Sequence, residues 1–181
     1  DDLRETIGVA LIKNGHSVNT GDSEALKQAE AWLLERKDKI SAFSYDIVSL
    51  VQAGDIAAAH WYVGATVYTL EEPDKLGFVI PEEGATMYQE DICVLKDAPN
   101  KDSATSFFEF YMQPEIAALN TLQQVNGSAN KPARDLLPAN LKSNPNTNPS
   151  PEVIAKLQIF EDLGNDLRKY NHVWTKVRTA Q

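Results

Sequence analysis

The chain has 181 residues, 43% of them hydrophobic, and a formal net charge of −9. This length suits one domain or one and a half, and the apolar fraction is sufficient for a buried core. The acidic balance argues against binding to nucleic acid or to an anionic membrane surface, but it is compatible with a cationic small ligand. The single cysteine, Cys93, excludes an internal disulfide and a cysteine-based zinc site.

Two helices are predicted at the start of the chain. The first spans residues 1–14 and ends at an Asn-Gly pair, and the second spans residues 22–36 behind an aspartate N-cap. Asp2 and Glu5 have the spacing of a capping box, in which each carboxylate accepts a backbone N–H of the first turn. The same carboxylates would also suit a binding cleft at the helix start, although the spacing alone favours the cap.

Four apolar-rich runs predict strands, and they cover residues 40–44, 56–63, 76–80 and 91–95. Short helices are predicted near residues 47–51 and 65–70, so helices and strands alternate. This alternation predicts an α/β layer with a largely parallel sheet. Trp61 ends the second run, where it is either a core residue or a ligand contact at a strand terminus. Cys93 lies inside the fourth run, which predicts a buried, inert thiol.

Residues 80–95 combine a proline–glycine turn with an aromatic side chain, Tyr88, and two acids, Glu90 and Asp91. An aromatic face beside a carboxylate suits a cation, because the ring attracts the charge and the carboxylate accepts its N–H bonds. The other interpretation, which this stretch alone favours, is a surface turn with a solvated acid pair.

The rest of the chain is mainly helical in pattern. Helices are predicted over residues 102–111 and 114–125, and Phe107, Phe108 and Tyr111 are expected in the core. The final helix is expected from about Pro151, with an interruption at a glycine and an amphipathic C-terminal part.

The chain carries no recognisable catalytic pattern. Its three histidines, His16, His60 and His172, are far apart, and there is no phosphate-binding loop, nucleophile elbow or Cys/His pair. We therefore expect a binding protein without metal or cofactor, rather than an enzyme.

Several short sequences, taken together, resemble one family. They are Asp-Asp-Leu-Arg-Glu at 1–5, Gly-His-Ser-Val-Asn-Thr at 15–20, Ala-Gly-Asp…Trp at 53–61, Pro-Glu-Glu-Gly…Tyr-Gln-Glu at 81–90, Ala-Pro-Asn-Lys at 98–101 with Pro-Glu at 114–115, Leu-Leu-Pro at 136–138, and Glu-Asp-Leu-Gly…Trp-Thr-Lys-Val at 161–177. In this order they resemble the bacterial periplasmic spermidine/putrescine-binding proteins, the substrate-binding subunits of polyamine ABC transporters. The resemblance covers nearly the whole chain and the C-terminal part of the family.

The resemblance implies an α/β fold like the type II periplasmic binding proteins, whose two lobes close on a linear polyamine. Residues 1–88 would form the core of the second lobe, residues 89–133 would cross to the first lobe, and residues 134–181 would return as C-terminal helices.

The resemblance also implies a ligand site. Asp2 and Glu5 match carboxylates that pair with ligand amines, Trp61 and Tyr88 match aromatics that sandwich the methylenes, and Glu90 matches an aspartate that takes an ammonium. Ser44 or Tyr45 lies where a polar cleft residue is expected. The departures from the family pattern are Tyr88 for a more usual Trp, Glu90 for Asp, Asn126 where some members have a cleft tyrosine, and Phe160 where some have a glutamine.

The implied function is a periplasmic solute receptor that delivers polyamines to an ABC permease. The alternative is a polyamine sensor or interaction module on the same fold. Because the family is roughly twice as long, we expect a fragment that binds polyamine weakly, with residues 89–133 lacking a lobe to dock on. A second copy of the chain would then cover their apolar side chains in a dimer.

Overall fold

The structure is a computed structural model that describes residues 2–180. Asp1, where the first predicted helix begins, and Gln181 lie outside the described residues. Two units are distinguished: the first contains residues 2–60, 80–88 and 152–180, and the second contains residues 61–79 and 89–151. The predicted lobe boundaries concern the whole two-lobed protein and stay a prediction.

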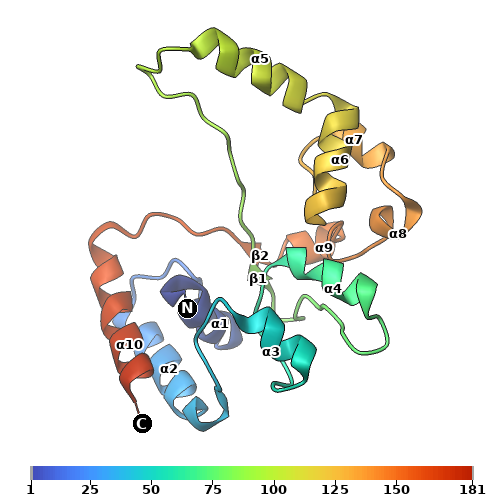
Figure 1. The fold of residues 1–181 in the computed structure, drawn as a ribbon. Helices are drawn as coiled ribbons and strands as arrows, with labels where there is room; N and C mark the ends of the chain where they lie inside the picture. The colour runs from blue at the N-terminus through green and yellow to red at the C-terminus, as the bar shows by residue number, and fades with distance from the viewer. Residues whose placement is uncertain (1, 181) are drawn as a thin grey trace. The chain divides into compact units, whose positions relative to one another are not determined.

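Three helices form the core of the first unit: α1 (Leu3–Lys13), α2 (Ser23–Leu34) and α10 (Leu167–Thr179). They lie side by side and bury their apolar faces against one another (Figure 1). Ile7, Leu11 and Leu26 are almost fully buried there, as are Tyr170 and Val177. The helical spacing of apolar residues therefore predicted these three elements correctly, because one apolar face per helix is what this packing requires.

The remaining elements of the first unit are short. They are η1 (Lys37–Lys39), α3 (Ile47–Ala53), β1 (Ala85–Thr86), β2 (Leu157–Gln158) and η3 (Gly164–Asp166), while α9 (Pro151–Ile154) precedes β2 at the boundary of the unit. Strands β1 and β2 pair in parallel, and the backbone N–H of Met87 donates to the carbonyl of Gln158 at 2.8 Å. Helix α3 ends at Gly54, whose φ of 81° is the left-handed conformation that glycine adopts without steric cost.

The second unit is built from helices. In chain order they are η2 (Val63–Ala65), α4 (Thr66–Glu71), α5 (Lys101–Tyr111), α6 (Pro114–Gln124), α7 (Lys131–Asp135) and α8 (Ala139–Lys142). Its small core joins α6, α7 and α8 through Ala118, Val125, Ala133, Leu137 and Leu141. Before α5, residues 89–95 run without helix or strand, as the chain leading to that helix in Figure 1 shows.

The strand predictions were wrong in detail. Within the described residues, none of the segments 40–44, 56–63, 76–80 and 91–95 forms a strand, and β2 lies where the last helix was expected to continue. An apolar run becomes a strand only when a neighbouring segment supplies the ladder hydrogen bonds, and that neighbour is not encoded locally. Helix α9 is accordingly a single turn, and the long C-terminal helix is α10.

Two burial predictions were also wrong. Cys93 is exposed, because the run that contains it has no sheet to pack in. On α5, Phe107 is 51% exposed, although it stacks on Tyr111 with ring centroids 5.7 Å apart. Phe108 and Tyr111 are half-buried. The second copy of the chain that would cover this face stays a prediction.

Across residues 2–180, no helix combines the length and the apolar character that crossing a bilayer requires.

Candidate functional site

The best-placed acidic side chain is Glu5, on the first turn of α1. Its side chain is only 15% exposed, and its Oε2 accepts a hydrogen bond from the Thr86 hydroxyl at 2.6 Å. The His60 Nε2 lies 3.8 Å from the same oxygen. Among the described residues no lysine or arginine forms an ion pair with this carboxylate. A shielded carboxylate with a neutral donor and an imidazole beside it is suited to accept N–H bonds from a cation.

Asp2 acts as the N-cap of α1. Its Oδ1 accepts the backbone N–H groups of Arg4 at 2.8 Å and of Glu5 at 2.9 Å. The Asp2 half of the predicted capping box is therefore confirmed. The Glu5 half is not seen among the described residues, because the Glu5 carboxylate accepts the Thr86 hydroxyl and no backbone N–H. The second oxygen of Asp2, Oδ2, makes none of these cap bonds.

Arg4, between the two acids, has a different role that sequence reasoning missed. Its guanidinium donates to the carbonyls of Val18 and Glu161, each at 3.2 Å, and to Asn19 Oδ1 at 2.8 Å. It also lies over the Phe160 ring, 4.6 Å from the centroid. Arg4 therefore connects α1 to a turn and to the segment after β2, and Phe160 is its packing partner.

The turn at residues 17–20 is fixed from several sides. Asn19 accepts the Glu161 N–H at 3.0 Å and donates to the Ile159 carbonyl at 2.8 Å. The buried Tyr170 hydroxyl lies 2.9 Å from both the Val18 and the Thr20 carbonyls, and burial raises the pKa of this phenol. This short sequence, which carries part of the family resemblance, thus connects α1, α10 and the segment after β2.

Gly84 determines how the chain enters β1. Its φ is +112°, and a Cβ at this position would lie 2.5 Å from the Lys156 carbonyl oxygen. Only glycine permits this conformation and this close approach. The turn delivers Thr86 to Glu5 and places Tyr88, 42% exposed, two residues further along.

The other two predicted ligand residues lie in the second unit, so the structure does not bring them together with Glu5 within one unit. Trp61 is half-buried and meets Tyr62 edge-on, with centroids 5.8 Å apart. Glu90 is exposed. Of the alternatives for a polar cleft residue, Ser44 accepts the Asp46 N–H at 3.0 Å and Tyr45 is 54% exposed.

Asn126, the remaining departure from the family pattern, also belongs to the second unit. Its Oδ1 is buried without a hydrogen-bond partner among the described residues, and it lies 3.1 Å from where a Cβ on Gly64 would stand. Gly64 thus leaves the space that this amide occupies.

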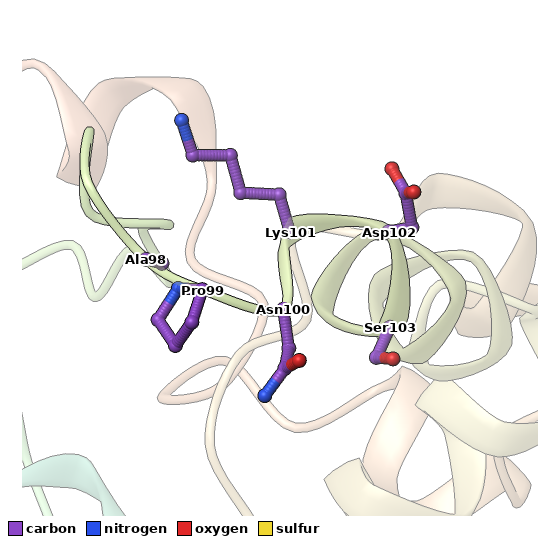
Figure 2. A pocket seen from close by; sticks show the side chains of 6 residues that line it. All are labelled: Ala98, Pro99, Asn100, Lys101, Asp102 and Ser103. Atoms are coloured by element: carbon purple, nitrogen blue, oxygen red, sulfur yellow. The ribbon is translucent and has the colours of Figure 1, made fainter.

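Away from Glu5, two further features of the described residues were candidates for a site: a metal-binding group and a hollow at the start of α5. The described residues contain no group of three or more His, Cys, Asp or Glu side chains arranged to hold a metal ion. A shallow hollow at the start of α5 is lined by Ala98, Pro99, Asn100, Lys101, Asp102 and Ser103. Figure 2 shows Lys101 and Asp102 pointing away from Asn100 and Ser103, so these side chains do not converge on a ligand position.

With this geometry in place, the chain can be compared with known proteins. Residues 2–149 match the sequence profile of a family described as bacterial extracellular solute-binding protein. The chain belongs to this family. It is 29% identical over its whole length to the putrescine-binding periplasmic protein SpuD of Pseudomonas aeruginosa, of which it covers 52%. It is 24% identical, again over its whole length, to spermidine/putrescine-binding periplasmic protein 1 of Haemophilus influenzae, of which it covers 51%.

Solved structures show the same relationship. The fold matches the spermidine/putrescine ABC transporter substrate-binding protein PotD from Streptococcus pneumoniae, solved with calcium and HEPES, with a TM-score of 0.90 and 25% identity. That match covers 99% of this chain and 56% of the solved one. The type II binding-protein fold is therefore confirmed, and the family consists of solute-binding proteins rather than enzymes. The chain spans about half the length of the curated relatives it matches.

Proposed function

We propose that this chain is part of a periplasmic binding protein that captures polyamines, such as putrescine or spermidine, for an ABC transporter permease. Relatives named for putrescine and spermidine binding support the ligand class, and their naming as periplasmic proteins supports the location. The observation that carries the proposal is the shielded Glu5 carboxylate, held by a hydroxyl and without a lysine or arginine partner among the described residues.

The chemistry of the ligand fits this acid. A polyamine at neutral pH carries ammonium groups separated by apolar methylenes, so its ends need carboxylates and its middle needs aromatic surface. Glu5 would accept an ammonium, Asp2 would add negative charge on the same turn, and Tyr88 would offer a ring face. By resemblance, Trp61 and Glu90 are the further candidates for ligand contact.

Glu5→Gln tests the proposal with little disturbance. The glutamine amide oxygen can still accept the Thr86 hydroxyl, so the substitution removes the charge and keeps the local hydrogen bond. A hydrogen bond to a charged group contributes about 1.5–3 kcal/mol. Putrescine affinity should therefore fall about 10- to 100-fold.

The measurement is isothermal titration calorimetry with putrescine and spermidine, on the protein that contains this chain. Glu24→Gln is the matched control, because Glu24 is an exposed acid on α2 whose one ion pair, with Lys27, spans 3.7 Å. The control should bind as the wild type does. Equal polyamine affinities for wild type and Glu5→Gln would show that Glu5 does not contact the ligand. A wild type that binds neither putrescine nor spermidine would refute the proposal.

A further inference from the structure

We infer that Thr86 is a positioning residue for the ligand ammonium: its hydroxyl occupies one oxygen of Glu5, Oε2, and thereby assigns the other, Oε1, to the ligand. This inference rests on the proposed function, since it concerns how the same carboxylate meets a cation.

The contacts of Glu5 are divided unequally between its two oxygens. The Thr86 hydroxyl donates to Oε2 at 2.6 Å, and the His60 Nε2 lies 3.8 Å from that same oxygen. Among the described residues, the hydrogen bond and the close imidazole contact of this carboxylate both go to Oε2, and neither goes to Oε1. A carboxylate has about four acceptor positions, and a side chain that is mostly shielded from water needs partners for them. Oε1 therefore keeps the capacity that an incoming N–H donor requires.

The hydroxyl that fixes Oε2 is itself held in place by the backbone. Thr86 is paired with Gln158 in the parallel β1–β2 ladder, and the next residue along, Met87, donates its N–H to the Gln158 carbonyl at 2.8 Å. The Gln158 side chain accepts the Val18 N–H at 3.0 Å, which ties β2 to the turn after α1. Because threonine is β-branched, few χ1 rotamers are open to it on a fixed strand. The donor is thus preorganised.

Preorganisation explains why a hydroxyl that does not touch the ligand would alter its affinity. A glutamate has three rotatable side-chain bonds, and ordering it costs free energy at the moment of binding unless the protein has already fixed it. Thr86 removes that cost by fixing the carboxylate before the ligand arrives. The hydroxyl is neutral, so it fixes the group without cancelling the charge that attracts the ammonium.

A purely structural role, joining α1 to β1, is the alternative, and a set of variants separates the two. Thr86→Val and Thr86→Ala both lack the hydroxyl, and Thr86→Ser keeps it. Putrescine titrated into the protein that contains this chain should bind about tenfold more weakly to the valine and alanine variants. The serine variant should stay within about twofold of wild type.

A double-mutant cycle provides the readout that a structural role would not move. In the Glu5→Gln background no carboxylate remains to be positioned, so Thr86→Val should cause little further loss of putrescine affinity. Three results would each overturn the role of Thr86. The first is wild-type putrescine affinity in both the valine and alanine variants, and the second is an equal loss of affinity in the valine, alanine and serine variants. The third is that Thr86→Val lowers the affinity as much in the Glu5→Gln background as it does in the wild type. These results would leave polyamine binding intact, whereas a wild type that does not bind putrescine would overturn the proposed function together with this inference.

Discussion

Arg4→Lys is the perturbation that best tests how the scaffold around the site is held. Arginine at this position reaches three acceptors, on Val18, Asn19 and Glu161, from one planar group. Lysine keeps the positive charge but has a compact ammonium that cannot span them in the same geometry. We therefore expect the first unit to lose stability while its net charge stays the same.

The magnitude follows from the contacts. Lysine should retain one of the three acceptors, and each lost hydrogen bond from a charged donor costs about 1.5–3 kcal/mol at most, less where water reaches it. In the other direction, the buried Arg4 Nε has no partner among the described residues, and removing that unsatisfied donor returns about 1–3 kcal/mol. The net expected loss is about 2 kcal/mol in the free energy of unfolding.

Urea denaturation followed by circular dichroism measures this loss, with Arg168→Lys as the control. Arg168 is an exposed arginine on α10 of the same unit, and its guanidinium takes part in none of the ion pairs found among the described residues. The control should change stability by less than about 0.5 kcal/mol. If Arg4→Lys were as stable as the control, the guanidinium contacts would not hold α1 to the turn and to the segment after β2.

Two further changes probe the entry to β1 and a helix cap. Gly84→Ala should weaken the β1–β2 pairing and lower both stability and putrescine affinity, because its Cβ would meet the Lys156 carbonyl at a φ of +112°. Gly77→Ala is the control, since open space surrounds the new Cβ, and it should leave the melting temperature unchanged. Equal melting temperatures for the two variants in thermal melts would contradict this prediction. Asp22 caps α2, and hydrogen bonds from the backbone N–H of Ala25 and its neighbour lower the pKa of this carboxyl. The pKa of Asp22 is lower in the folded than in the unfolded chain, so the ionised carboxylate stabilises the folded state at pH values above the usual aspartate pKa of about 4. This stabilisation is lost as the pH falls through the folded pKa. Asp22→Asn keeps the cap but cannot titrate. The free energy of unfolding of this variant, measured from pH 6 to pH 2, should therefore decline less than that of the wild type. Parallel curves of stability against pH would show that this carboxyl contributes nothing to the loss of stability in acid.

The resemblance identified the family from short sequences, and the structure adds contacts of these residues that the resemblance did not predict. Asp2 and Glu5 were expected to contact ligand, and the structure adds that Asp2 is a cap and that Glu5 is held by Thr86, 81 positions away in sequence. Thr86 had no signal of its own, because a threonine in a β-prone stretch is ordinary. Arg4 could have been noticed as a cation between two acids, but its partners lie up to 157 positions away.

The sequence by itself determined the elements whose hydrogen bonds are local. Helices α1, α2 and α10 follow from an apolar repeat of three and four residues, and helix ends follow from aspartate caps and from glycines such as Gly54. Only the tertiary structure decided which extended segments pair and which acid is shielded. The physical reason is that a ladder or a side-chain hydrogen bond such as that from Thr86 to Glu5 needs two partners brought together by folding, and neither partner carries a mark of the other in its own neighbourhood.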